Sequence, residues 1–542
     1  MKLLLTSVFG PFGVDDQYGR ADNKMELFHN QVTREQGIFS YRFHHPSFGL
    51  YFLAENLSIP TTVLDFPDLE AFISEIKKGY DYIGISFIIP NFLKAKKMTE
   101  LIRELSPHTK IILGGHGTNI PKIETLLSFD HLCRGEGVYF LRKLFHEDVD
   151  APIKHPLING TYNKQIMGVN VPNETGIIIS GVGCANKCRF CATSHFFGNY
   201  TPYLKTGKDV YDLCCRYEDE QGVRDFGIMD ENFLKDTERA KELVALMEKN
   251  HRYFSFAIFS SAETLGKFEN LDFLVRLGIN FIWMGVESKR EVYEKNQGTD
   301  FPQLVKELRS RGISVMTSVI LFQEHHDQET IWEDINFACE LNSDYVQFMQ
   351  LGPIPGTKLY EDYLKEGKLL LDIPYEEQHG QDKIWFKHPS FSLEDSKEFL
   401  VKAFQKEYEV NGASFVRMIE TSRQGYQHSL GHYNPHIRER AKEFKKILDL
   451  TRPFYPAILL LSPYKSTKRL VAHLIKMQNP ATLRAKGLTV AVTALALKEQ
   501  IRIKLFSDKR PPPQIKTYFN LEKKKKILTR KKSSSYHELR VN

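Results

Sequence analysis

Residues 184–191 read Cys-Ala-Asn-Lys-Cys-Arg-Phe-Cys, and they include three of the seven cysteines in the 542-residue chain. So few cysteines do not form a disulfide framework, and their clustering is typical of a metal site in a reducing compartment. Zinc normally takes four protein ligands, and only His195 could supply a fourth here. The spacing therefore favours an iron–sulfur cluster with one open iron, bound by Cys184, Cys188 and Cys191.

The cysteine loop lies near the start of a series of alternating strands and helices. Apolar strand candidates are separated by helix candidates such as 235–250 and 330–341, which predicts a parallel sheet covered by helices. Six such units predict a partial (β/α)6 barrel, and the loop follows the first strand, at the face where barrels hold active sites. The strand candidates are 177–180, 225–229, 255–260, 280–286, 314–321 and 345–349.

A similar series occupies the first 150 residues. Its strand candidates are 2–8, 61–66, 82–87, 110–113 and 131–133, and its clearest helix candidate is 91–105. The pattern predicts a Rossmann-like, doubly wound parallel sheet, in which ligands bind at the carboxyl ends of the strands. Tight turns alone would also explain the glycines at these ends. The residues there are Ser86, Phe87, Gly114, Gly115, His116, Gly135, Glu136 and Gly137.

The chain is too long for one ordinary domain. It is predicted to be an α/β protein with a mainly helical C-terminal region and a basic, disordered tail. An aromatic insertion, residues 10–45, is expected to fold over a ligand or against the second domain. The expected parts are an N-terminal domain at 1–150, a linker at 151–173, the barrel at 174–370, the helical region at 371–510 and the tail at 511–542.

The pattern Cys-x3-Cys-x-aromatic-Cys resembles the signature of the radical S-adenosylmethionine (SAM) superfamily. The resemblance implies that the three cysteines bind a 4Fe-4S cluster and that SAM chelates its fourth iron. Motifs after the other strands are similar to segments that hold SAM in this family, although a carboxylate after a strand is also a common helix cap. They add as SAM-binding residues Phe190, Asp230, Glu231, Asn232, Glu287, Ser288 and Leu351.

The order of domains resembles the cobalamin-dependent branch of that superfamily over residues 1–370. Segments 81–86, 111–116 and 134–137 are similar to its N-terminal domain, and 350–360 to the segment after its last strand. The resemblance implies that the eight strand-end residues given above bind cobalamin. The Asp-x-His-x-x-Gly motif of other cobalamin enzymes is absent, so no lower ligand of cobalt is predicted.

Two regions do not match the branch. The stretch 318–326 replaces the usual glycine-rich segment after the fifth strand, and its His325 and His326 either face a substrate or lie in a solvated loop. The region after residue 370 carries no chemical motif. Its candidate pocket residues are Trp385, Tyr426, His428, His432 and Tyr433.

The resemblance implies an enzyme that reductively cleaves SAM to a 5′-deoxyadenosyl radical, binds cobalamin and methylates an unactivated carbon. One alternative is a cobalamin-associated radical enzyme that rearranges, cyclises or oxidises its substrate. Another is a non-catalytic protein that binds the cluster and a corrinoid. The expected partners are a small-molecule substrate, with a lipid or other hydrophobic metabolite as one option, and an electron donor such as flavodoxin or ferredoxin.

Charge is unevenly distributed, with a net +10 from Arg502 onward and −4 before it. A basic run without interleaved aromatics does not indicate nucleic acid, whereas the apolar stretches 455–461 and 488–497 leave a peripheral membrane surface open. No window is long enough to span a bilayer, and the first residues are expected to form a strand, not a signal peptide. We therefore expect a cytoplasmic protein, with peripheral contact at the inner face of the membrane as the alternative.

Overall fold

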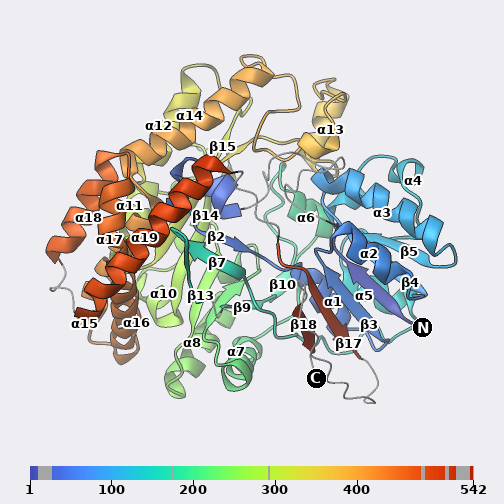
Figure 1. The fold of residues 1–542 in the computed structure, drawn as a ribbon, viewed down its shortest axis with the longest axis horizontal. Coiled ribbons are helices and arrows are strands. Elements are labelled where there is room, and N and C mark those ends of the chain that lie inside the picture. Colours follow the sequence, from blue (N-terminus) through green and yellow to red (C-terminus); the bar gives the residue numbers. More distant parts are fainter. Residues whose placement is uncertain are drawn as a thin grey trace.

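The computed structural model describes residues 1–9, 27–172, 175–290, 293–477, 483–506, 512–520 and 537–540. Figure 1 shows an N-terminal α/β part in blue, a central sheet with its helices in green and yellow, and a group of C-terminal helices in orange and red. The α/β class and the mainly helical C-terminal region are confirmed.

The N-terminal sheet contains five parallel strands in the order β3-β1-β4-β5-β6. The chain moves from β1 to one side for β3 and returns to the other side for β4, so the direction of winding changes between β1 and β4. Ligands of open parallel sheets bind at such a point. The strands are β1 (Leu3–Thr6), β3 (Thr61–Asp65), β4 (Tyr82–Ser86), β5 (Lys110–Gly114) and β6 (His131–Leu132). They are covered by α1 (Phe48–Glu55), α2 (Leu69–Ile76), α3 (Phe92–Leu105) and α5 (Gly137–Leu144).

The same sheet corrects the prediction of a disordered tail. Residues Ile515–Phe519 form β17, which pairs antiparallel with β3, and Ile515 and Phe519 are buried. Lys516 pairs with Glu75 at 2.7 Å. Ile515, Thr517 and Phe519 alternate along the strand and are buried, and the basic residues around this short segment concealed that pattern. The basic runs 523–526 and 530–532 lie outside the described residues.

The central sheet has six parallel strands, each lying beside the one before it in the chain. Because all six point the same way, their carboxyl ends share one edge, where the loops after each strand meet. The strands are β9 (Thr175–Ile178), β12 (Asp225–Ile228), β13 (Ser255–Phe259), β14 (Ile279–Glu287), β15 (Ser314–Leu321) and β16 (Tyr345–Gln350). The helices between them include α7 (Gly207–Gln221), α8 (Thr237–Lys249), α11 (Phe301–Ser310) and α12 (Thr330–Glu340).

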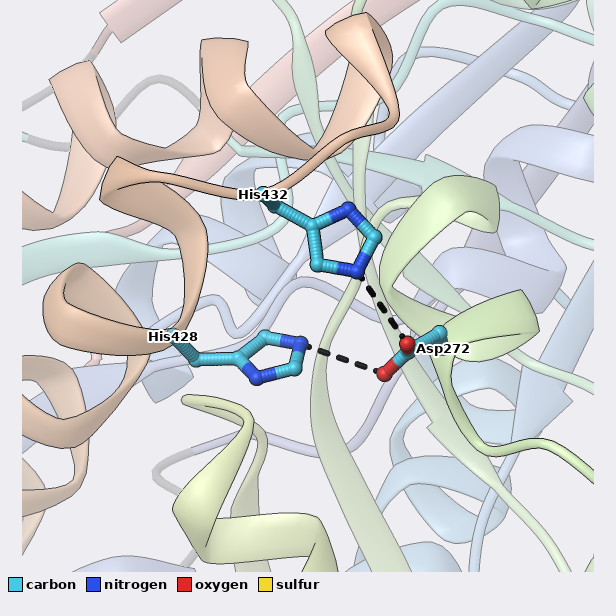
Figure 2. Close-up of side chains that lie close together, drawn as sticks. All are labelled: Asp272, His428 and His432. Atoms are coloured by element: carbon cyan, nitrogen blue, oxygen red, sulfur yellow. Dashed lines mark hydrogen bonds and ion pairs between the residues drawn. The ribbon is translucent and has the colours of Figure 1, made fainter.

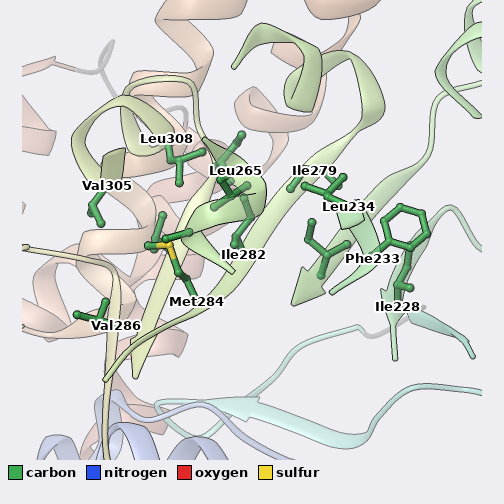
Figure 3. Close-up of a cluster of buried hydrophobic side chains, with 14 of the residues drawn as sticks. Ile228, Phe233, Leu234, Leu265, Ile279, Ile282, Met284, Val286, Val305 and Leu308 are labelled. Atoms are coloured by element: carbon green, nitrogen blue, oxygen red, sulfur yellow. The ribbon is translucent and has the colours of Figure 1, made fainter. Parts of the chain in front are cut away.

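A continuous apolar core joins this sheet to its helices. Figure 3 shows side chains of β14, such as Ile282 and Met284, beside Val305 and Leu308 of α11, and these four residues are fully buried. Their burial, at about 25 cal/mol per Å² of apolar surface, fixes the strands relative to the helices. The carboxyl edge is thereby held as a rigid frame for its loops.

The described part of the insertion packs against the central sheet, one of the two arrangements expected from the sequence. Residues Leu27–Val32 form the helical turn η1, which contacts β16. The ring of Phe28 lies 5.3 Å from that of Tyr345, and Gln347 donates a hydrogen bond to Gln31 at 3.2 Å. The expectation for residues 10–26 falls outside the described part of the chain.

The linker between the sheets is pinned to the central sheet. The hydroxyl of Tyr217 donates to the carbonyl of Ile177 and accepts from the amide of Ile158, both at 2.8 Å. His155 lies buried beside them, with Nδ1 2.7 Å from the carbonyl of Pro156 and Nε2 2.8 Å from the amide of Ile179. Since an amide can only donate, Nε2 accepts and the imidazole is neutral.

We expect this imidazole to make stability fall in mild acid. Burial lowers the pKa of His155 to about 4, against 6.5 in the unfolded chain. Between these values only the unfolded chain takes up the proton, so stability is complete above pH 6.5 and is lost as the pH decreases, by about 2 kcal/mol at pH 5.

Unfolding free energies at pH 7.5 and pH 5 measure the effect. His155→Gln should be less stable than wild type at pH 7.5 but should lose about 2 kcal/mol less on acidification. Other buried histidines contribute equally to both proteins, so only the difference between the two losses is diagnostic. Equal losses would contradict the assignment.

The C-terminal helices pack on the outside of the central part and on the linker. They include α14 (Leu393–Asn411), α15 (Ser414–Leu430), α16 (Pro435–Thr451), α17 (Tyr455–Leu461), α18 (Lys465–Met477) and α19 (Leu483–Leu505). Among the described residues, no helix combines the length and apolarity needed to cross a bilayer.

Candidate functional site

The three clustered cysteines lie on the loop that leaves β9 and ends at Cys191, the residue before α6 (Ala192–Phe197). All three thiols are unpaired and partly buried. Burial raises the pKa of Cys184 and Cys188, and the charges of neighbouring cysteines raise it further, because the sulfurs lie close together. Thiols in such surroundings ionise when they bind a metal, which supplies the missing positive charge.

A cavity of about 890 Å³ opens beside this loop, at the carboxyl edge of the central sheet. Three of the predicted residues line it, namely Cys188, Phe190 and Leu351. The ring of Phe190 lies 5.3 Å from that of Tyr293, which also lines the cavity. The cavity is large enough for a nucleoside-sized ligand next to the cysteines.

Lys295 is a lining residue that the sequence analysis missed. Its Nζ lies 2.5 Å from a carboxylate oxygen of Glu287. Burial by itself lowers the pKa of Lys295, but the charges of Glu287 and Cys188 outweigh it and raise the pKa. A buried ammonium thus lies between the predicted carboxylate and the cysteine loop. No spacing rule marks it, because it follows Glu287 by eight residues and lies in a separate helical turn, η6 (Glu294–Asn296).

Asp230 and Asn232 are not brought to this cavity. One oxygen of Asp230 accepts from Ser180 and Tyr200, both at 2.7 Å, and from Arg239 at 3.0 Å. The amide of Asn232 donates to hydroxyls after β13. These hydrogen bonds within the protein position the strand ends.

The other residues predicted to bind SAM, Glu231, Glu287 and Ser288, differ in how deeply their side chains are buried. Glu231 is exposed and close to the loop, and desolvation by the protein around it raises the pKa of its carboxyl. Glu287 is buried against Lys295 and adopts φ +65°, an unusual conformation for a residue with a side chain. Ser288 is buried and accepts a hydrogen bond from the amide of Arg290.

Two further cavities, of about 310 and 190 Å³, lie at the carboxyl edge of the N-terminal sheet. All eight residues predicted for cobalamin line one or both of them. The larger lies at the switch between β1 and β4, where it is bounded by Ser7, Phe87 and His116. The smaller lies between the sheet and helices α1 and α5, next to Gly135 and Gly137. The strand-end residues chosen from the sequence therefore lie at the edge of the N-terminal sheet where the two cavities are found.

The residues at these cavities fit the edge of a flat apolar group. Gly115 has φ +83°, and a Cβ there would lie 2.6 Å from the carbonyl oxygen of Phe87, so only glycine permits this close turn. His116 lies over Phe196 with ring centroids 4.5 Å apart, and burial lowers its pKa to about 4. Its Nδ1 is buried without a hydrogen-bond partner among the described residues. Such an orphaned atom is costly unless a ligand or water satisfies it.

Glu136 has a structural role at the carboxyl edge of the N-terminal sheet. Its carboxylate accepts from the amides of Val138 and Tyr139 at the start of α5 and from the hydroxyl of Tyr203 in the central part of the chain. The side chain therefore caps α5 and links it to Tyr203, which lies in the chain between β9 and β12 of the central sheet. It lines the smaller cavity, but its oxygens are already in use.

The structure places the two candidate histidines after β15 in different surroundings. His325 lines the large cavity. His326 is buried, with Nε2 2.9 Å from Asp334, and Nδ1 accepts from the amide of Gln323. Trp385 is buried and donates to the carbonyl of Pro353, and the other C-terminal candidates line none of the three cavities given above.

Two of those candidates meet Asp272 from α10 (Asp272–Leu277), as Figure 2 shows. Its oxygens lie 3.1 Å from Nε2 of His428 and 3.2 Å from Nε2 of His432. Nδ1 of His432 accepts from the amide of Asn434, so Nε2 carries the hydrogen and has no lone pair for a metal. Arg311 also contacts Asp272, at 3.0 Å. The group therefore ties α10 to α15 electrostatically and is not arranged as a metal site.

Comparison with known proteins agrees with the central part of this description. The model of the Radical SAM superfamily matches residues 178–338, from the end of β9 through most of α12. This range contains the three cysteines, Lys295 and Glu287. The chain therefore carries a radical SAM domain.

The similar proteins of known name are distant. An uncharacterized methyltransferase, PH0819, of Pyrococcus horikoshii is 23% identical over 63% of this chain and 81% of its own length. Bacteriochlorophyllide d C-8(2)-methyltransferase of Chlorobaculum tepidum is 23% identical over 54% of this chain and 70% of its own. Cytidylyl-2-hydroxyethylphosphonate methyltransferase of Streptomyces wedmorensis is 24% identical over 36% and 39%. All three carry methyltransferase names.

Proposed function

We propose that this protein is a radical SAM enzyme that binds a 4Fe-4S cluster, SAM and cobalamin and methylates an unactivated carbon. The observation that carries the proposal is helix α6. It begins directly after Cys191, and Phe196 and Phe197 at its end line the smaller cavity of the N-terminal sheet. Six helical residues span about 9 Å. The cysteine loop and the proposed cobalamin cavity are therefore held about one short helix apart.

The proposal assigns roles to groups on both sides of α6. Cys184, Cys188 and Cys191 would hold the cluster, and Lys295 offers a buried cation for a carboxylate such as that of SAM. The N-terminal sheet, as a Rossmann-like domain, would hold cobalamin between its strand ends and α1. The central sheet, as a partial barrel, would hold the cluster and SAM at its carboxyl edge. Bound there, the cluster supplies an electron for reductive cleavage of SAM to methionine and a 5′-deoxyadenosyl radical, and cobalamin supplies a methyl group.

The larger N-terminal cavity supports a hydrophobic small-molecule substrate. Leu27, Phe28, Phe43, His44 and His45 of the insertion line it. The insertion thus covers the strand ends and excludes water, which protects reactive intermediates. An external electron donor such as flavodoxin or ferredoxin would approach from the cysteine side.

Anaerobic reconstitution with iron, sulfide and hydroxocobalamin tests the proposal. We expect about four irons and one cobalt per chain, and both 5′-deoxyadenosine and S-adenosylhomocysteine after incubation with SAM, reductant and substrate extract. 5′-Deoxyadenosine alone would indicate radical chemistry without methyl transfer. Both cofactors without SAM cleavage would indicate a non-catalytic binding protein. Iron without cobalt would reject the cobalamin assignment.

Filling the smaller cavity should remove cobalt and leave iron. Gly49 lines this cavity, and a Cβ there would meet nothing within 4 Å, so Gly49→Leu adds bulk at the cavity from a position where the backbone tolerates a side chain. We expect cobalt content to fall at least about tenfold with iron unchanged. Gly431→Leu is the matched control, because Gly431 is equally open and lines no cavity described here. Equal cobalt in both variants would place cobalamin elsewhere.

A further inference from the structure

Helix α19 is apolar on two opposite faces. Its inner face includes the buried Val492 and Ala496, which pack in the core of the C-terminal helices. Its outer face carries Val490, Leu497 and Ile501, whose exposed fractions are 72%, 39% and 56%. Apolar residues all round are typical of a helix covered on every side. In Figure 1, α19 runs across the front of the C-terminal helices, and no other helix formed by the described residues covers it there.

The outer apolar residues form one stripe. They follow at intervals of four, three, four and four residues, which keeps them on one helical face over about four turns. Exposed Lys498 and Lys504 lie along the two sides of the stripe. Lysines at such positions can extend their ammonium groups to lipid phosphates while their stems lie along apolar surface. The stripe consists of Val490, Ala494, Leu497, Ile501 and Leu505.

The charge of the surrounding segment indicates what could cover the stripe. Residues 455–506 contain nine Lys/Arg and one acidic residue, Glu499, which pairs with Arg502. From residue 455 to the end the chain has 20 basic and 4 acidic residues, against 53 and 63 before it. A basic surface on an otherwise acidic protein is oriented toward a negatively charged plane by electrostatics alone.

We propose that the outer face of α19 is a membrane-binding surface that lies in the headgroup region of an anionic bilayer. The apolar stripe would enter the acyl boundary, with Lys498 and Lys504 at the level of the phosphates. The helix would lie parallel to the membrane without crossing it. This proposal rests on the surface alone and does not require the catalytic assignment.

Flotation of the reconstituted full chain with vesicles tests it. We expect binding to vesicles of 70% phosphatidylcholine and 30% phosphatidylglycerol, at least about tenfold weaker binding to pure phosphatidylcholine, and loss of binding as salt rises from about 0.05 to 0.5 M. No binding to anionic vesicles at low salt would overturn the proposal.

The double variant Val490→Glu/Ile501→Glu should weaken vesicle binding at least about tenfold, because two apolar contacts become charged. Leu371→Glu is the control, since Leu371 is exposed and lies outside this surface. Both variants should keep the iron content and circular dichroism of wild type. Sedimentation velocity distinguishes a protein interface: a dimer that the double variant converts to monomer, without vesicle binding, would show that a second copy covers the stripe.

Discussion

Replacing Cys188 with alanine is expected to abolish cluster binding and SAM cleavage. Two thiolates cannot hold the three irons that the loop is proposed to bind, so iron should fall to background. Without that source of electrons, 5′-deoxyadenosine formation should decrease by a factor of at least about 10³, or about 4 kcal/mol in the barrier. Iron analysis and product chromatography measure the two effects.

Cys215→Ala is the matched control for this variant. Cys215 is a partly buried free thiol on α7, away from the loop. Its removal should leave iron and SAM cleavage within about twofold of wild type. Full iron content in the Cys188 variant would show that the metal is held elsewhere and would remove the basis of the proposed function.

The sequence predicted the strands of both sheets because continuous apolar runs separated by helices are strong signals. Each of the five N-terminal strands and the six central strands begins within two residues of its expected position. These edges carry the cysteine loop and the glycine turns, so the location of the candidate sites followed from the same periodicity. Local hydrophobic pattern was sufficient where each strand pairs with a neighbour from the same series.

The local hydrophobic pattern did not predict pairing between segments that are far apart in the sequence. β17 pairs with β3 across about 450 residues of chain, and its Lys516 meets Glu75. Nothing in the sequence of either segment indicates that the two pair. The basic residues around β17 led to the prediction of a disordered tail. Lys295 was missed for a similar reason: its importance comes from its contact with Glu287, which depends on the course of a loop.

Asp230 was predicted to bind SAM, and in the structure its side chain is engaged in an ion pair within the protein. A carboxylate directly after a strand can contact a ligand, or it can hold the end of the strand in place through bonds within the protein. Here the side chains of Asp230 and Arg239 are each only 3% exposed and form a 3.0 Å ion pair. Arg239 also donates to the carbonyls of Leu204 and Phe233. The ion pair therefore fixes the chain just after β12, where Glu231 is the next residue.

Removing either partner should leave an uncompensated buried charge and cost about 3–5 kcal/mol. Asp230→Ala and Arg239→Met should each lower the thermal midpoint by about 4 °C, and the double variant should recover part of this loss because no lone charge remains. SAM affinity of the double variant, measured by equilibrium dialysis, should stay within about threefold of wild type. If the double variant is stable but binds SAM more than about tenfold more weakly, which is about 1.4 kcal/mol, then Asp230 contacts SAM directly. The ion pair would then be secondary to ligand binding.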